Sequence, residues 1–185
     1  LALDPANGEV LWETTEAKPT YGTGAVVSIA GVDMVITPRG DCVRVADGKR
    51  LANELGELEY ASPIVCKDIV YFVGETTVAW KLENKSDGNF RPLRLWESDE
   101  LEGEFYASPV LHERVLFTAS NEGTLYALDA KTGGLLYQHT LEIRSASGLP
   151  GMEPANLYGS PIRAGKHMLL ENDVGEALVV LPGRE

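Results

Sequence analysis

The chain has 185 residues, of which 44% are hydrophobic and 24% are charged, and these ordinary globular values exclude disorder as its main state. Its 28 acidic and 16 basic residues give a net charge of −12, so we expect the chain to repel nucleic acid and anionic membranes. No apolar run approaches the roughly 20 residues of a membrane-spanning helix. The two cysteines, Cys42 and Cys66, are too few for a disulfide scaffold or a structural zinc site.

The chain begins inside a motif, Leu1-Ala2-Leu3-Asp4, and not with an initiator methionine. No charged region followed by an apolar stretch is present there, so no signal peptide is visible. We therefore interpret the sequence as an engineered segment or as a piece of a longer natural chain, and its own N-terminus indicates no compartment.

Two phrases recur along the chain. A Tyr-x-Ser-Pro phrase opens three units, and a weaker copy opens one more; their tyrosines are Tyr21, Tyr60, Tyr106 and Tyr158. The closing phrase reads A-L-D-P-A-N-G-E-V-L-W at residues 2–12 and A-L-D-A-K-T-G-G-L-L-Y at residues 127–137. Repeats of about 40–50 residues with four short strands are typical of β-propellers. The sequence therefore predicts an all-β propeller of four-stranded antiparallel blades, with about four blades present.

The predicted elements follow this repeat. Residues 1–13 are expected to be the end of a blade, and four units begin near residues 21, 60, 106 and 158. In the unit that opens at Tyr106, strands are predicted at residues 108–111, 115–119, 124–128 and 135–141. No apolar pattern of helical spacing extends over a useful length, so no helix is predicted.

The last unit has sequence for three strands only, and residues 1–13 could supply the fourth. Three arrangements follow from this. The chain is an arc of a larger ring, or a four-bladed ring closed by that strand exchange, or half of an eight-bladed ring built by two copies.

The closing phrase has a structural interpretation. Asp4 and Asp129 can accept hydrogen bonds from backbone N–H groups one or two residues later, and Gly8 and Gly133 supply a positive φ that completes the turn. Trp12 is predicted to be largely buried between blades. Tyr137 occupies the matching position in the later copy, Trp96 does so after an insertion, and a worn copy of the phrase covers residues 45–51.

These phrases resemble the tryptophan-docking repeat of the PQQ-like, quinoprotein-type β-propeller family. The resemblance covers nearly the whole chain and implies about seven or eight blades in a complete ring. It also implies an exported bacterial protein, periplasmic or extracellular. The active dehydrogenases of the family carry adjacent cysteines beside the quinone, and Cys42 and Cys66 are not adjacent.

The resemblance therefore favours the BamB-like branch, a non-catalytic scaffold for protein–protein interaction. The alternatives are a fragment of a quinone-dependent dehydrogenase and a ligand-sensing or carbohydrate-binding domain. We assign no catalytic, cofactor-binding or metal-binding residue. The expected partner is another protein, with a homodimer or the missing blades of a longer chain as further possibilities.

The candidate binding face follows from blade topology. Connections after strands two and four of a blade share one face, which places the inter-blade connections, including residues 98–105 and 143–157, together. The longer of these connections is the stronger candidate for a binding role. An acidic cluster in the other is interpreted as a solvated loop and not a calcium site. The candidate binding residues are Asp99, Glu100, Glu102, Glu104, Met152 and Asn156.

Overall fold

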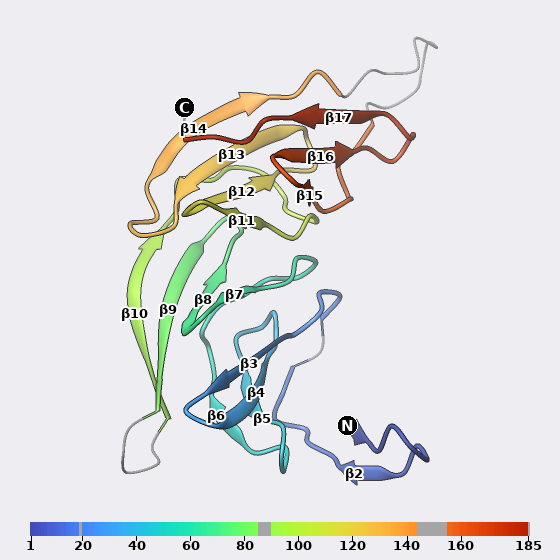
Figure 1. The fold of residues 1–185 in the computed structure, drawn as a ribbon, viewed down its shortest axis with the longest axis vertical. Helices are drawn as coiled ribbons and strands as arrows, with labels where there is room; N and C mark the ends of the chain where they lie inside the picture. The colour runs from blue at the N-terminus through green and yellow to red at the C-terminus, as the bar shows by residue number, and fades with distance from the viewer. Residues whose placement is uncertain (19, 85–89, 144–154, 185) are drawn as a thin grey trace. The chain divides into compact units, whose positions relative to one another are not determined.

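The computed structural model describes residues 1–18, 20–84, 90–143 and 155–184, and the regular structure in these ranges is entirely β-strand (Figure 1). The strands form three four-stranded sheets, one three-stranded sheet and one two-stranded hairpin. In each larger sheet the spatial order of the strands follows the chain, and the paired strands are antiparallel. The predicted all-β propeller blades are confirmed.

The strands have the following bounds. The hairpin consists of β1 (Ala2–Leu3) and β2 (Val10–Trp12). The first two complete sheets consist of β3 (Ala25–Ile29), β4 (Val32–Ile36), β5 (Cys42–Arg44) and β6 (Arg50–Ala52), and of β7 (Ile64–Cys66), β8 (Ile69–Phe72), β9 (Thr77–Asn84) and β10 (Phe90–Ser98). The third consists of β11 (Val110–His112), β12 (Val115–Ala119), β13 (Thr124–Asp129) and β14 (Leu135–Thr140), and the three-stranded sheet of β15 (Ile162–Ala164), β16 (His167–Glu171) and β17 (Ala177–Val180).

The sheet that follows Tyr106 lies close to its prediction. Strand β12 has the predicted bounds, while β11 begins at Val110, two residues later than expected. Pro109 has no N–H group for a ladder, and the N–H of Ser108 donates to the side chain of Ser160 at 2.9 Å. The Ser-Pro pair therefore links this sheet to the next one and does not begin the strand.

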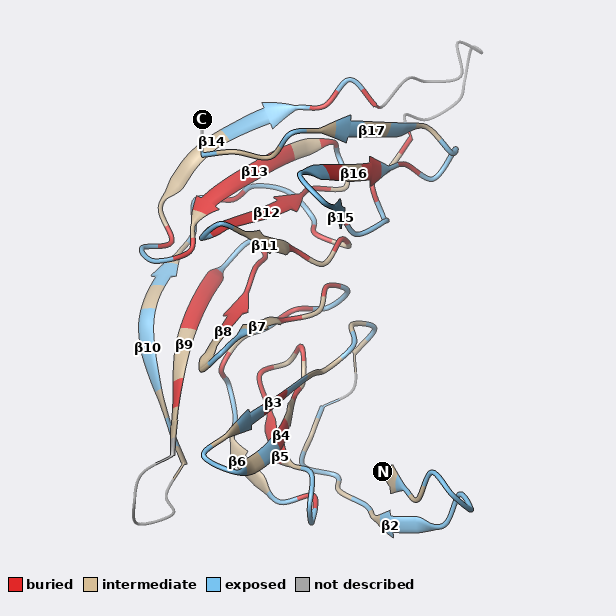
Figure 2. Ribbon diagram, in the orientation of Figure 1, coloured by how far each residue is buried: buried red, intermediate tan, exposed pale blue. Residues whose placement is uncertain are grey.

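The chain divides into two compact units, Leu1–Phe72 with Val78–Leu95, and Val73–Thr77 with Trp96–Glu185. The first unit has a core cluster around Met34, Ile36 and Phe72, all fully buried. The second has a cluster around Phe117, Leu157 and Met168. Burial is concentrated in the middle strands of the sheets, as the red segments of β12 and β13 show (Figure 2).

The closing phrase forms the same turn three times. The N–H groups of Gly8, Gly48 and Gly133 donate to the carbonyl oxygens of Asp4, Arg44 and Asp129 at 2.8, 2.9 and 2.8 Å. All three glycines have φ between +72° and +78°, a conformation that L residues rarely adopt. The worn copy thus has Arg44, and not Asp47, at the aspartate position.

Two of these turns receive an aromatic side chain from the preceding outer strand. Nε1 of Trp12 donates to the carbonyl of Val45 at 2.7 Å, and Nε1 of Trp96 donates to that of Ala130 at 3.2 Å. The indole rings lie directly on Gly48 and Gly133, where a Cβ atom would overlap them. Trp12 is partly buried on this turn, while most residues of its hairpin are exposed.

The opening phrase makes a second link between neighbouring sheets, at the start of the inner strands. The Oγ of Ser62 accepts from the N–H of Thr23 at 3.0 Å, as Ser160 does from Ser108. The tyrosines of the phrase also meet in pairs. The rings of Tyr21 and Tyr60 stack with centroids 5.3 Å apart, and those of Tyr106 and Tyr158 meet edge to face at 4.9 Å.

We expect Gly133→Ala to destabilise the protein by about 2–4 kcal/mol, because alanine would have to adopt the left-handed φ of this glycine and its Cβ atom would clash with Trp96. Gly175, in the same unit, also has a positive φ, but no atom lies within 4 Å of the place that an added methyl group would occupy, so Gly175→Ala should cost only about 1–2 kcal/mol. Urea unfolding of both variants measures the difference. Equal losses would show that aromatic docking contributes nothing measurable.

Candidate functional site

Two inter-blade connections of the second unit meet at one residue. The N–H of Asn121, in the turn between β12 and β13, donates to the carbonyl of Glu104 at 2.8 Å, and its carbonyl accepts from Leu157 at 3.1 Å. Asn156 is fixed from the next sheet, because its N–H donates to Oδ1 of Asp173 at 2.9 Å. Glu104 and Asn156 therefore lie on the same face of the second unit.

Glu100 lies elsewhere. Its Oε2 accepts from the N–H of Leu135 at 2.8 Å, and Leu135 begins β14 at the end of the sheet opposite Asn121. The connection after β10 thus runs across the sheet from one end to the other. Glu102 lies between these two points, Asp99 directly precedes Glu100, and both residues are exposed. Met152 lies outside the described residues.

The inter-blade connection of residues 98–105, called here the acidic connection, is anchored by apolar residues that alternate with its charged ones. Leu101 is 2% exposed and Phe105 is 9% exposed, while Glu102 and Glu104 between them are exposed. The carbonyl of Glu102 also accepts from the hydroxyl of Tyr126 at 2.9 Å. These anchors fix the backbone, so the carboxylates form a surface with a defined geometry.

Asn172 is a positioning residue that the sequence analysis did not identify. It is 5% exposed; its Nδ2 donates to the carbonyl of Ile143, and its Oδ1 accepts from the N–H groups of Val174 and Glu176. It therefore fixes both the β16–β17 turn and the first residue of the long connection. The Asn-Asp-x-Gly sequence around it is a turn signal, but the long-range bond to Ile143 has no sequence signature.

The pKa shifts of two titratable groups, Cys42 and Asp47, are explained by burial and by a hydrogen bond. Burial raises the pKa of the Cys42 thiol to about 12, so this thiol stays protonated and unreactive at neutral pH. The hydrogen bond from Arg44 lowers the pKa of Asp47 to about 2. Among the described residues, no three His, Cys, Asp or Glu side chains come together as a metal site. The described part of the chain also contains no helix with the length and apolarity that a membrane crossing requires.

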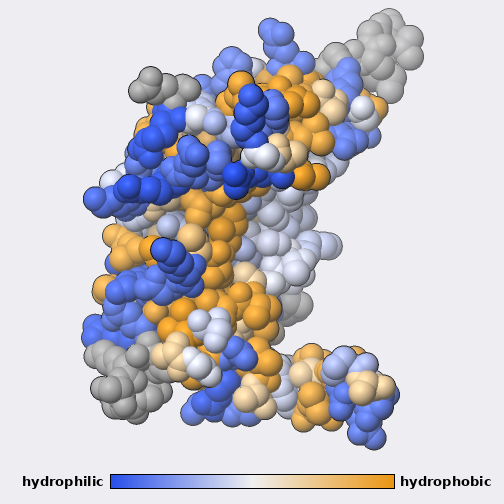
Figure 3. All heavy atoms as spheres, in the orientation of Figure 1, coloured by the Kyte–Doolittle hydropathy of each residue, from blue (hydrophilic) through white to orange (hydrophobic). Residues whose placement is uncertain are grey.

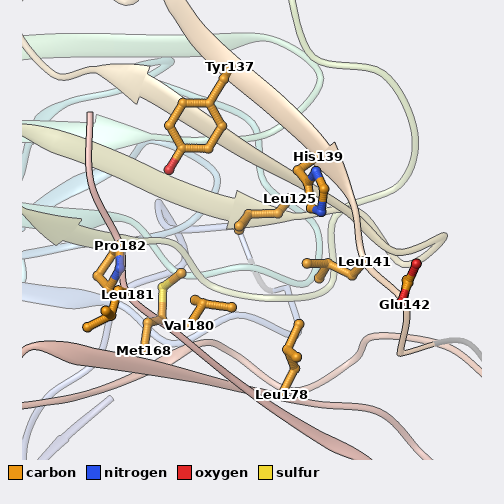
Figure 4. A pocket seen from close by; sticks show the side chains of 10 residues that line it. All are labelled: Leu125, Tyr137, His139, Leu141, Glu142, Met168, Leu178, Val180, Leu181 and Pro182. Carbon is orange, nitrogen blue, oxygen red and sulfur yellow. The ribbon is translucent and has the colours of Figure 1, made fainter. Parts of the chain in front are cut away.

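An apolar pocket of about 350 Å³ lies in the second unit (Figure 4). Tyr137, His139 and Leu141 line one side of it, and Leu178, Val180 and Pro182 line the other. It lies beside the outer strand β14 and the last strand β17. His139 is the one histidine that lines the pocket.

Comparison with known proteins gives one family match. A family model described as outer membrane protein assembly factor BamB matches residues 92–177. No curated protein matches the chain in sequence.

Several solved structures are similar. BamB from Moraxella catarrhalis is 16% identical with a TM-score of 0.57, over 92% of this chain and 49% of that one. The computationally designed Ika4 protein is 14% identical with a TM-score of 0.60, over 95% and 99%. The quinohemoprotein alcohol dehydrogenase ADHIIG from Pseudomonas putida HK5 is 14% identical with a TM-score of 0.54, over 87% and 30%. These likenesses show the fold, and this chain spans about half the length of that BamB.

Asp129 provides a test of the structural role of the closing phrase. Its Oδ1 accepts from the N–H groups of Lys131 and Thr132 at 2.8 and 3.2 Å, and its Oδ2 pairs with Arg184. The Arg184 guanidinium lowers the pKa of this carboxyl in the folded protein. The ionised side chain therefore stabilises the fold above the ordinary carboxyl pKa of about 4, and this contribution is lost as the pH falls through the lowered value.

We expect Asp129→Ala to cost about 1–2 kcal/mol at neutral pH, with the difference from the parent chain shrinking as the pH falls below about 4. Thermal and urea unfolding across this range measure it, and Asp99→Ala is the control, expected to change stability by less than about 0.5 kcal/mol. A variant with unchanged stability that no longer binds a ligand would contradict the structural role.

Proposed function

We propose that this chain, whose residues 92–177 match the BamB family model, is a non-catalytic PQQ-like propeller scaffold that binds another protein through the face that carries Glu104 and Asn156. The observation that carries this proposal is the acidic connection, whose exposed carboxylates are held on buried apolar anchors. A preformed charged surface of this kind favours recognition of a partner, because little conformational entropy is lost on binding.

The charge of the chain supports a partner with a basic surface. With a net charge of −12, the protein attracts cationic surfaces over a distance and repels anionic ones. We place the binding residues Asp99, Glu102, Glu104 and Asn156 on the interface, with Met152 as a further member. Glu100 takes a positioning role, since it is bound to the backbone of Leu135.

We extend the proposal to the compartment by likeness to BamB, the outer membrane protein assembly factor. On that basis the chain is part of an exported bacterial protein, periplasmic or extracellular. Oxidation dependent on pyrroloquinoline quinone is the second candidate, favoured by the likeness to ADHIIG. Against it, the two cysteines are separate, with Cys42 buried and Cys66 exposed.

The scaffold proposal predicts a charge-dependent interaction. A partner purified by its binding to the immobilised chain should bind Glu104→Lys about tenfold more weakly, a loss of about 1.4 kcal/mol, and added salt should weaken its binding to the parent chain. Glu113→Lys is the matched control, since Glu113 is an exposed glutamate in the turn at the opposite end of the same sheet. Titration calorimetry gives the dissociation constants.

Equal weakening by both variants would place the interface elsewhere. A new absorbance band on addition of the quinone and calcium, with turnover of an alcohol, would contradict the scaffold proposal and support the dehydrogenase function.

A further inference from the structure

Two tyrosines of the second unit form an aromatic pair that remains partly exposed. Tyr106 and Tyr158 precede β11 and β15, the first strands of neighbouring sheets (Figure 1). Their rings meet edge to face with centroids 4.9 Å apart, and Tyr158 is 48% exposed. In an edge-to-face pair each ring keeps at least one face that the other ring does not cover. The pair therefore offers an accessible aromatic face to a partner.

A carboxylate of the acidic connection contacts this pair. The hydroxyl of Tyr106 donates to Oε2 of Glu104 at 3.1 Å. Among the described residues, Oε1 of Glu104 has no hydrogen-bond partner, so it remains available to a ligand. Because Glu104 and Tyr158 both contact Tyr106, a negative charge lies beside the exposed aromatic pair.

The backbone holds these three residues in place from both directions. The N–H of Ser108 donates to Oγ of Ser160 at 2.9 Å, which ties together the segments that follow the two tyrosines. The N–H of Asn121 donates to the carbonyl of Glu104, and its carbonyl accepts from the N–H of Leu157, which ties together the segments that precede them. Little conformational freedom is therefore lost when a ligand binds.

The first unit contains a similar aromatic pair without a carboxylate at the corresponding position. The rings of Tyr21 and Tyr60 stack with centroids 5.3 Å apart, and Tyr21 is 80% exposed. Two residues before Tyr60, at the position that Glu104 occupies before Tyr106, stands Leu58, which is 4% exposed. Paired tyrosines are thus common to both units, whereas a carboxylate at this position belongs to the second unit.

A carboxylate beside an exposed ring fits a guanidinium group. A guanidinium is planar and always charged, stacks on aromatic faces and pairs with carboxylates through two N–H donors. An ammonium group is a compact charge that lacks this planar fork. Residues 96–185 include 14 acidic and 6 basic side chains, and hydrophilic residues form much of the visible surface of the second unit (Figure 3). Long-range attraction therefore favours a cationic ligand here.

We propose that Glu104, Tyr106 and Tyr158, called here the arginine site, bind an arginine side chain of the partner protein. The guanidinium stacks on the ring of Tyr158 and donates to the carboxylate of Glu104, while the hydroxyl of Tyr106 holds that carboxylate in position. This inference rests on the proposed scaffold function, since it assigns the chemistry of one contact on the same face.

A short peptide tests the site without the partner. The blocked tripeptide acetyl-Gly-Arg-Gly-amide, titrated into the isotopically labelled chain, should shift the ring resonances of Tyr106 and Tyr158 in a saturable way. The lysine tripeptide should bind at least about threefold more weakly. The citrulline tripeptide, which has nearly the shape of arginine without its charge, should give no saturable shift. Equal binding of the three peptides, or no shift with arginine, would overturn the arginine site.

Substitutions separate the charge from the ring. Glu104→Gln and Tyr158→Leu should each raise the dissociation constant of the arginine tripeptide at least about fivefold. Tyr158→Phe should retain most of the binding, because it keeps the aromatic face. Amide spectra verify that each variant is folded. If Tyr158→Phe weakened binding as much as Tyr158→Leu, the stacking contact would be refuted.

Matched controls come from positions outside the site. Tyr21→Leu removes an exposed paired tyrosine of the first unit, and Glu113→Gln removes an exposed carboxylate at the opposite end of the same sheet. Both should leave the dissociation constant of the arginine tripeptide unchanged. Weakening by either control as large as that by Glu104→Gln would show non-specific attraction and overturn the site.

The tripeptide and the purified partner also distinguish this inference from the scaffold function. If the partner binds Glu104→Lys more weakly but the arginine tripeptide does not bind, the scaffold function stands and the arginine site is overturned. If the tripeptide binds with the expected pattern but Glu104→Lys does not weaken the binding of the partner, the arginine site is supported and the scaffold interface is wrong.

Discussion

The cohesion of each unit depends on a flat aromatic side chain that lies on a glycine. The indole ring covers the backbone of the turn, its N–H finds a carbonyl acceptor on the same turn, and no other residue leaves room for it. Each contact combines burial of a large apolar surface with a satisfied polar group. Because the turn has the same hydrogen bonds whether or not a ring is docked on it, its backbone is a preformed receptor.

The two repeated phrases make different contacts between neighbouring sheets. The closing phrase links outer strands, and the opening phrase links the starts of inner strands through a serine hydroxyl and paired tyrosines. Residues that recur in every blade are thereby occupied by structural contacts. The connections between the blades differ from one another. In the acidic connection the backbone is fixed, but the side chains at its exposed positions make no contact that the fold requires.

Much of this architecture could be predicted from the sequence because each repeated residue has a local reason to be there. Glycine marks a positive φ, and aspartate marks a turn, so the strand bounds around residues 115–140 follow from short-range rules. The polar links between sheets have no such signal. The hydrogen bond from Ser108 to Ser160 explains why β11 begins later than predicted, and the hydrogen bond from Asn172 to Ile143 was not predicted. The position of Glu100 was also beyond sequence reasoning, because a connection can cross a sheet as easily as stay on one face.

The docking contacts join residues only 33 and 34 positions apart. Chain closure over such spans costs little entropy, and each contact involves only neighbouring sheets. Folding of such a molecule can start in any sheet and spread to its neighbours. A sequence change that weakens one docked ring would then raise the opening rate at that boundary while the remaining sheets keep their structure. Local opening, detected by hydrogen exchange, is therefore the expected form of damage, in place of a single collapse of the whole fold.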